Sequence, residues 1–373
     1  MSVQTNHSLH NTSQSLRNTS RVVVAMSGGV DSSVTAALLV RQGYEVIGMM
    51  LRLWNEPGTE TTNRCCTPDA MALARRIAAQ LEIPFYPVDA KVPFRDSVVE
   101  SFIDGYTHGV TPNPCLVCNR YIRWGLLLDR ARALGAQSLA TGHYARLQQD
   151  PSGHIQLLRA HDKAKDQSYV LHVLTQEHLA NTMLPLGEYT KLQVRSLAQE
   201  FGLPVADRPD SQDLCFLGDG DYGSFLSRIA PQVNDPGSIL NKDGETLGQH
   251  RGLAFYTIGQ RKGLGLTASR PLYVLKKDFQ RNALIVGEKH QLGKSDLSAG
   301  NVNWIAGDPP PEPLRAQVKI RYKAAPVWAT VTPLENQGAH VVFDEPLPDI
   351  TPGQAAVFYD SEICLGGGTI LGP

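Results

Sequence analysis

The sequence lacks several features that mark whole classes of protein. No apolar run approaches the roughly 18 residues that a membrane-spanning helix requires, so we expect no membrane segment. The 35 basic and 36 acidic residues give a formal net charge of −1, so no overall basic excess points to a nucleic-acid partner. This argues only weakly against such a partner, because a local basic stripe can contact phosphates on a balanced surface.

Cysteine is also scarce, with six residues in a chain of 373. In the absence of a secretory signal, so few cysteines are typical of reduced thiols in a cytoplasmic protein rather than of a disulfide framework. Residues 1–20 are polar, contain no acid and have a single Arg, whereas transit peptides are richer in Arg. We therefore expect a disordered extension at 1–20, followed by two or three globular domains.

Residues 21–218 alternate short apolar runs with helical segments. Strands are predicted at 21–26, 44–51, 84–89 and 138–141. One helix is predicted at 32–42, and another after Thr67-Pro68-Asp69, which supplies an N-cap, a proline at the first helical position and a first-turn acid. This alternation predicts an α/β domain with a doubly wound parallel sheet.

Beyond residue 218 the pattern changes to turns and short alternating runs. Asp235-Pro236-Gly237 and Lys242-Asp243-Gly244 are turn signals, and alternation continues to the C-terminus. These runs predict two smaller domains, the last an all-β barrel or, as the alternative, a sandwich. We predict an ATP-binding catalytic domain at 21–218, a central mixed or β domain at 219–298 and a C-terminal β-barrel at 299–373.

A glycine- and serine-rich loop, Ser27-Gly28-Gly29-Val30-Asp31-Ser32-Ser33, separates the first strand from the first helix. Glycines let a backbone approach a phosphate, and a helix N-terminus directs N–H groups at the anion. Asp31 is placed to hold the Mg²⁺ that accompanies a nucleotide. The Gly-Lys-Ser/Thr ending of a Walker A loop is absent. The loop resembles the pyrophosphate loop of the ATP-pyrophosphatase superfamily, which implies ATP cleavage between the α- and β-phosphates and transfer of AMP.

Two cysteines lie in segments with a polar, turn-rich setting. Cys118 follows Thr111-Pro112-Asn113-Pro114-Cys115, at the start of a helix predicted to run to Leu134, where the helix N-terminus favours thiolate. Cys215 closes the run Asp210-Ser211-Gln212-Asp213-Leu214. Half of a zinc site is one alternative for Cys115-x-x-Cys118, but no second pair accompanies it, and a thioredoxin-like dithiol lacks its usual context. We therefore predict no metal site at the cysteines; Cys65, Cys66 and Cys364 are interpreted as structural.

Seven motifs in order make the chain, over residues 21–373, similar to the bacterial and organellar tRNA-specific 2-thiouridylases. They are S-G-G-V-D-S at 27–32, T-P-N-P-x-x-x-C-N at 111–119, A-T-G-H-Y at 140–144, K-D-Q-S-Y at 165–169, D-S-Q-D-x-C-F at 210–216, G-Q-R-K-G-L-G at 259–265 and T-P-G-Q at 351–354.

The resemblance implies roles for individual residues. Cys118 matches the nucleophile and Cys215 the cysteine that carries a persulfide. The nucleotide contacts match Ala25, Met26, Ser27, Gly28, Gly29, Val30, Asp31, Ser32, Leu51 and Gly142. The positions beside the target base match Asn113, Pro114 and Cys115, although many members have Asp where this chain has Cys115. The tRNA contacts match His143, Lys165, Asp166, Gln167, Arg321, Tyr322 and Gln354.

The implied reaction is adenylation of the C2 oxygen of the wobble uridine, followed by sulfur transfer from the persulfide. ATP and Mg²⁺ are the implied cofactors. The implied partners are the anticodon stem-loop of tRNA and a persulfide donor, either a cysteine desulfurase or a sulfur-relay protein. Two other functions stay open on the residues alone: an AMP-forming ligase acting on a small metabolite, which has no need of distant thiols, and a non-catalytic RNA-binding or redox-scaffold protein.

Overall fold

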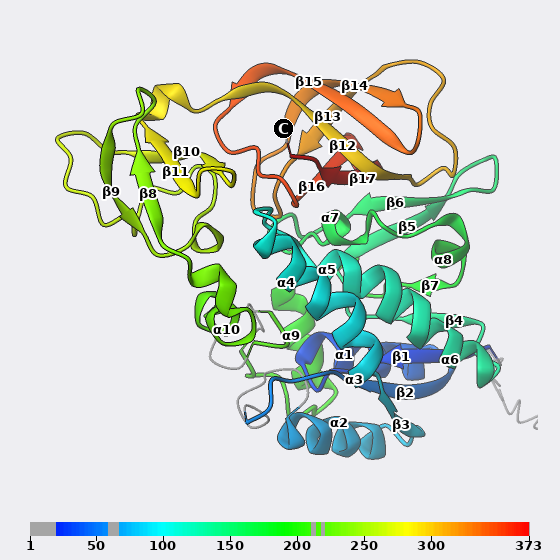
Figure 1. Cartoon of the computed structure of the whole chain (residues 1–373). Helices are drawn as coiled ribbons and strands as arrows, with labels where there is room; N and C mark the ends of the chain where they lie inside the picture. Colours follow the sequence, from blue (N-terminus) through cyan, green and yellow to red (C-terminus); the bar gives the residue numbers. More distant parts are fainter. Residues whose placement is uncertain (1–19, 59–66, 210–213, 218–220, 373) are drawn as a thin grey trace, which may run out of the picture.

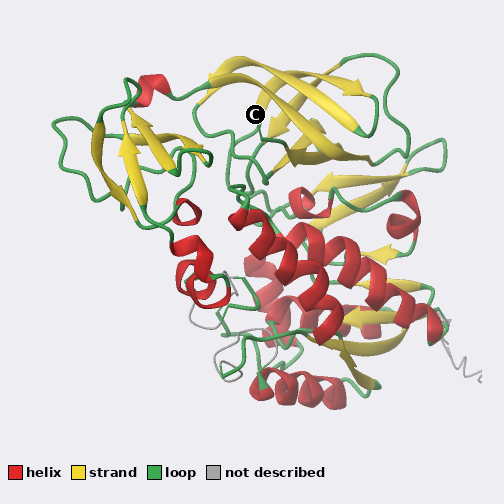
Figure 2. Cartoon of the chain, viewed as in Figure 1, coloured by secondary structure: helices red, strands yellow, loops and turns green. Residues whose placement is uncertain are grey.

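The structure is a computed structural model that describes residues 20–58, 67–209, 214–217 and 221–372. The extension expected at 1–20, except for Ser20, lies outside the described residues. Cys65, Cys66 and residues 210–213 of the Cys215 motif also lie outside them. The helices gather around the sheet of the N-terminal part, whereas strands dominate the two parts that follow (Figure 2).

A parallel five-stranded sheet forms the centre of the N-terminal part (Figure 1). Its order is β3 (Phe85–Asp89), β2 (Glu45–Arg52), β1 (Arg21–Ala25), β4 (Ser138–Ala140) and β7 (Thr182–Met183), and every neighbouring pair is parallel. The predicted α/β sheet is confirmed. The short apolar run of β1 is explained by its central place, since the side chains at 22–24 are at most 1% exposed.

Helices cover both faces of this sheet. Val22 and Val24 pack with α1 (Val30–Arg41), α2 (Pro68–Gln80) and α9 (Lys191–Glu200). Val23, which points the other way, packs with a long helical run made of α5 (Pro114–Val117), the π-helical η2 (Cys118–Leu127) and α6 (Leu128–Ala133). The remaining helical segments of this part are α3 (Lys91–Phe94), η1 (Arg95–Val99), α4 (Glu100–Thr107), α7 (Ser168–Leu171) and α8 (Gln176–Ala180).

The central part joins one helix to a four-stranded sheet. Helix α10 (Tyr222–Ile229) leads into strands in the order β10 (Tyr273–Asp278), β11 (Ala283–Gly287), β8 (Gly237–Leu240) and β9 (Thr246–His250). Short 3-10 turns lie at Pro231–Asn234, Leu253–Phe255 and Lys289–Gln291.

The C-terminal part is a closed barrel of six strands. They follow the order β12 (Lys294–Trp304), β15 (Gly338–Leu347), β14 (Val327–Leu334), β13 (Leu314–Lys319), β16 (Ala355–Asp360) and β17 (Ile363–Ile370). Strand β17 also pairs with β12, which closes the ring. The structure therefore confirms the predicted barrel over the alternative sandwich.

A hairpin from the N-terminal part extends the barrel sheet. Strands β5 (Ala145–Gln149) and β6 (Ile155–Arg159) form the hairpin, and Leu157 of β6 pairs with Cys364 of β17. The sequence analysis did not predict these strands. The N-terminal and C-terminal parts therefore share hydrogen-bonded strands, although they are about 200 residues apart in the chain. The predicted domain limits at 218 and 298 remain predictions.

Among the residues that the structure describes, none of the helices combines the length and the apolar character that crossing a bilayer takes.

Candidate nucleotide and thiol site

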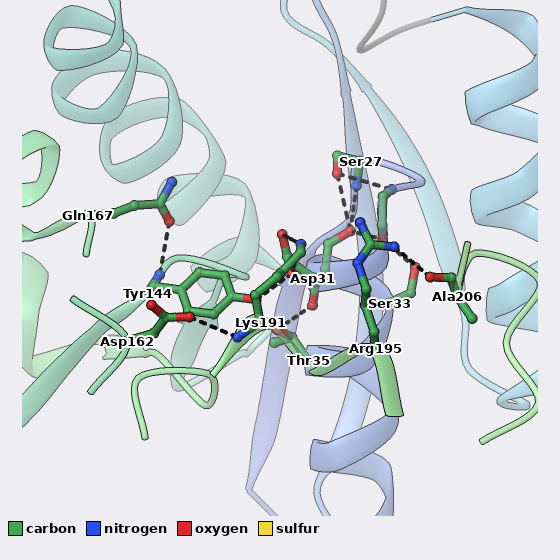
Figure 3. Close-up of polar contacts among 12 residues, drawn as sticks. Ser27, Asp31, Ser33, Thr35, Tyr144, Asp162, Gln167, Lys191, Arg195 and Ala206 are labelled. Carbon is green, nitrogen blue, oxygen red and sulfur yellow. Dashed lines mark hydrogen bonds and ion pairs between the residues drawn. The ribbon is translucent and has the colours of Figure 1, made fainter. Parts of the chain in front are cut away.

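The loop between β1 and α1 is tightly folded around its glycines and serines (Figure 3). Gly28 has φ +72°, and a Cβ there would lie 2.7 Å from the Ala70 carbonyl oxygen of α2, so only glycine fits. The hydroxyls of Ser32 and Ser33 donate to the Gly29 carbonyl at 3.2 and 2.8 Å. The loop presents the N-terminus of a 12-residue helix, which suits an anion.

Asp31, in the first turn of α1, is ion-paired with Lys191. The Lys191 ammonium donates to the two carboxylate oxygens at 2.7 and 2.8 Å, and the Tyr144 hydroxyl donates to Oδ1 at 2.7 Å (Figure 3). The side chain of Lys191 is only 11% exposed. The sequence analysis missed Lys191 and Tyr144.

The sequence contains a capping box that indicates the start of the helix carrying Lys191, and this signal went unused. Thr190 accepts from the Gln193 N–H at 3.3 Å, and Gln193 Oε1 accepts from the Thr190 N–H at 2.7 Å. Thr190-x-x-Gln193 is therefore the start of a helix, with Lys191 at its first position.

The other predicted nucleotide residues lie around the same loop. A Cβ on Gly142, just after β4, would lie 2.9 Å from the Asp31 carbonyl carbon and the Ser32 nitrogen, so the end of β4 abuts the start of α1. Leu51 lies near the end of β2, the strand beside β1. Arg208, a further residue that the sequence analysis missed, donates to the Gly28 carbonyl at 2.8 Å. Residues 25–32 and Gly142 therefore lie together at the carboxyl edge of the sheet, and their role at a nucleotide stays a prediction.

Cys118 lies one turn into its helical run. Asn113 caps the run, accepting from the Cys115 N–H at 3.2 Å, and Pro114 is the first helical residue. The prediction that Cys118 starts the helix is therefore wrong by about one turn, because the cap and proline act before it. The thiol is 8% exposed, and the favourable effect of the helix N-terminus is smaller there than at Cys115.

Cys118 and Cys215 lie in one hydrophobic cluster. Cys118 is a buried member of the cluster, and the half-buried Cys215 packs against it. Phe216, next to Cys215, is buried, with its ring centroid 5.2 Å from that of Phe102 and 6.0 Å from that of Phe94. The fold thus places two cysteines that are 97 positions apart (215 − 118) at the same hydrophobic cluster.

His143 and Gln167 lie beside the phosphate loop. The His143 Nδ1 is 2.7 Å from the Thr141 hydroxyl, and the ring is 5.6 Å from that of Trp124. Burial, with a smaller contribution from Arg123, holds the pKa of His143 well below its usual range, so the imidazole is neutral at pH 7. Gln167 Oε1 accepts from the Tyr144 N–H at 2.9 Å, at the backbone end of the residue whose hydroxyl contacts Asp31 (Figure 3).

Asp166 has a structural setting among the predicted tRNA contacts. It is 7% exposed and accepts from the N–H groups of Ala160 and Ser168 and from the Ser168 hydroxyl. Its neighbour Lys165 is half-buried. Of the two, only Lys165 therefore has an accessible side chain.

Three predicted contacts come from the barrel. Arg321 pairs with Asp349. Burial, followed by the charges of Asp166 and Cys115, raises the pKa of Tyr322. Gln354 Nε2 donates to the Thr111 carbonyl at 2.7 Å. The barrel therefore faces the loop that precedes the Cys118 helix.

Within the described residues no cluster of three or more His, Cys, Asp or Glu side chains could hold a metal ion by itself.

Comparison with known proteins covers nearly the whole chain. Residues 20–219 match the family described as the tRNA methyl transferase HUP domain, 223–288 the tRNA methyl transferase PRC-barrel domain and 294–370 the aminomethyltransferase beta-barrel domain. The chain is 50% identical to the tRNA-specific 2-thiouridylase MnmA of Magnetococcus marinus, over 94% of this chain and 99% of that one. It is 49% identical to the corresponding protein of Symbiobacterium thermophilum, over 94% of this chain and 92% of that one.

Proposed function

We propose a residue-level chemistry for this chain, which belongs to the tRNA-specific 2-thiouridylase family. It is a tRNA sulfurtransferase, an enzyme that makes 2-thiouridine in tRNA, and we assign the wobble uridine as its target. The proposal assigns the ATP-dependent and sulfur-transfer steps to the loop at 25–32 and to the two clustered cysteines.

The first step activates the base. A uridine C2 carbonyl is a poor electrophile, so its oxygen must be converted into a leaving group, and attack of that oxygen on the α-phosphate of ATP makes the leaving group AMP and releases pyrophosphate. The N-terminus of α1 faces the phosphates, with Gly28 permitting close approach. Lys191 and Arg208 add two cationic groups at the same loop.

Asp31 fits the role of a Mg²⁺ ligand whose carboxylate is shared with Lys191. The carboxylate accepts three hydrogen bonds, from Lys191 and Tyr144, and an ionised carboxylate has about four lone-pair sites. Mg²⁺ usually takes one or two protein carboxylates together with phosphate oxygens and water. Asp31 would hold the ion while keeping Lys191 in place, and the ion would neutralise phosphate charge.

The second step transfers sulfur. Cys215 carries the persulfide, Cys215–S–SH. Its terminal sulfur attacks the activated C2 carbon and displaces AMP, and the Cys118 thiolate then attacks the Cys215 sulfur. The S–S bond of the persulfide breaks, its electron pair stays on the new thiouridine sulfur, and a Cys118–Cys215 disulfide remains. In the alternative order Cys118 first releases hydrosulfide, which then attacks C2. A thiol reductant restores the cysteines in either case.

The substrate contacts follow the family match. The target base, unstacked from the anticodon loop, lies beside Asn113, Pro114 and Cys115. The direct tRNA contacts are His143, Lys165, Gln167, Arg321, Tyr322 and Gln354. Asp166, which also matches a tRNA-contacting position of the family, instead shapes the loop at 160–168. A cysteine desulfurase or sulfur-relay protein loads Cys215, and the reaction takes place in the cytoplasm.

The shared cluster of Cys118 and Cys215 is the observation that supports this assignment most strongly. Mass spectrometry of tRNA nucleosides from cells that lack the protein tests the function. We expect 2-thiouridine to disappear from the wobble position and to return when the wild-type gene is restored. An unchanged 2-thiouridine content would contradict the proposal.

A further inference from the structure

The loop that leads into the Cys118 helix is held by all three parts of the molecule. Residues 108–113 join α4 to α5. A Cβ on Gly105 of α4 would lie 2.8 Å from Pro112, so the two pack closely. Phe279, directly after β10 of the central part, fills the space where a Cβ of Gly109 would be. The third set of contacts comes from the barrel.

The barrel contact is made by the T-P-G-Q turn at 351–354. The Thr111 N–H donates to the Pro352 carbonyl at 2.8 Å, and Gln354 Nε2 donates to the Thr111 carbonyl at 2.7 Å. Between them Gly353 has φ +90°, and a Cβ there would lie 2.9 Å from backbone atoms of Thr111. Both backbone polar groups of Thr111 are therefore bonded to the barrel, at a distance that only glycine allows.

Thr111 stands two residues before the helix cap. Asn113 caps the run, and Pro114 is its first residue, so the position of Thr111 fixes where the helix begins and in which direction it leaves the loop. Cys118 follows one turn later on the same helical run.

We propose that Gln354 is a positioning residue: through the Thr111 carbonyl it fixes the loop from which the Cys118 helix starts, so that the barrel sets the place of the nucleophile. The nucleophile's role rests on the proposed function. A primary amide has a second N–H and a carbonyl oxygen, so Gln354 can hold Thr111 and contact RNA at the same time.

Gln354→Met tests the proposal because methionine keeps the length of the side chain and removes the donor. Gln176→Met is the matched control: its Nε2 donates to the Ile155 carbonyl of β6 and also joins the N-terminal part to the barrel at the Ile305 carbonyl. Hydrogen exchange followed by mass spectrometry should show faster exchange at 110–117 in Gln354→Met and unchanged exchange there in Gln176→Met. Gly353→Ala should give the same local change as Gln354→Met.

Turnover distinguishes positioning from RNA contact. At saturating tRNA, where concentration compensates for a weakened RNA contact, Gln354→Met should still lose several-fold to about tenfold in 2-thiouridine formation, the range of one hydrogen bond. Normal exchange at 110–117, or a raised Kd with normal turnover at saturation, would overturn the proposal. A wild-type protein that makes no 2-thiouridine would instead contradict the proposed function, and the exchange result would still stand.

Discussion

At the scale of single residues, ion pairing sets which charged side chains lie at the loop between β1 and α1. Asp31 was predicted from sequence as a magnesium ligand, and in the fold its carboxylate also holds the ammonium of Lys191. The loop motif can predict Asp31 because this residue lies within the motif. It cannot predict a lysine 160 positions away, which only the packing of α9 on α1 brings near.

Lys191→Met should weaken binding of a non-hydrolysable ATP analogue by about 10- to 100-fold, the range expected for losing a charged hydrogen-bond donor. Isothermal titration calorimetry measures this directly. Lys163→Met removes a lysine that pairs with Glu362 at the surface and should leave the affinity unchanged. Equal affinities for wild type and Lys191→Met would show that the lysine does not serve the nucleotide.

Cys118→Ser and Cys215→Ser should each reduce 2-thiouridine formation to background while ATP still binds, because each removes one sulfur atom of the transfer. Cys364→Ala is the control, since this buried thiol lies in a different hydrophobic cluster, between the parallel sheet, the helical run and the barrel. Nucleoside mass spectrometry gives the measurement. Full 2-thiouridine formation by either serine variant would contradict the role of that cysteine in sulfur transfer.

At the scale of elements, local signals predicted helix starts better than strand pairing. The Thr67 hydroxyl accepts from the Ala70 N–H at 3.0 Å, and α2 begins at Pro68 as its cap predicts. The β5–β6 hairpin was missed because its pairing partner, β17, lies some 200 residues later. A short strand with polar residues such as Gln148 and Gln149 has little signal of its own.

The capping box of α9 gives a prediction at this scale. Thr190→Ala should cost about 1 kcal/mol of stability and also weaken ATP binding, because it loosens the turn that carries Lys191. Thr175→Ala removes the equivalent cap of α8 and should cost a similar amount without changing ATP affinity. Urea unfolding together with calorimetry separates the two effects. A loss of affinity in both variants would indicate a general loss of stability.

At the scale of the whole molecule, the contact between the N-terminal part and the barrel encloses titratable groups. His172 is 2% exposed, its Nδ1 bonds the Tyr169 carbonyl at 2.7 Å, and its own carbonyl accepts from Asn303 of β12. Burial, partly offset by the Tyr169 bond, lowers its pKa to about 4. The folded protein therefore holds His172 neutral where the unfolded chain is protonated.

Stability should consequently fall as pH decreases from about 6.5 towards 4. The unfolded state binds more protons in this window, and for His172 the loss between pH 7 and pH 5 is about 2 kcal/mol. Urea unfolding at pH 7 and pH 5 should show that the free energy of unfolding falls by about 2 kcal/mol less in His172→Gln than in wild type. An identical pH dependence in variant and wild type would mean that other groups, such as His143, dominate the acid response.

The parallel sheet, the barrel and the phosphate loop were predictable because their signals are local: apolar runs, alternation, glycines and caps. The placement of Cys118 and Cys215 at one hydrophobic cluster was predictable only through the family resemblance, since no spacing rule links residues 97 positions apart. The contact between the T-P-G-Q turn and Thr111 was not predictable from local signals or from the family resemblance, because it depends on how the barrel packs against the helical run.

Reconstitution with purified components tests the central claim most directly. The protein, loaded with persulfide on Cys215, is mixed with ATP and unmodified tRNA, and nucleosides, AMP and pyrophosphate are quantified in a single turnover. We predict one 2-thiouridine for each AMP and pyrophosphate released, with Cys118 and Cys215 left as a disulfide. Formation of 2-thiouridine without that disulfide, or equal formation by Cys118→Ser, would contradict the account.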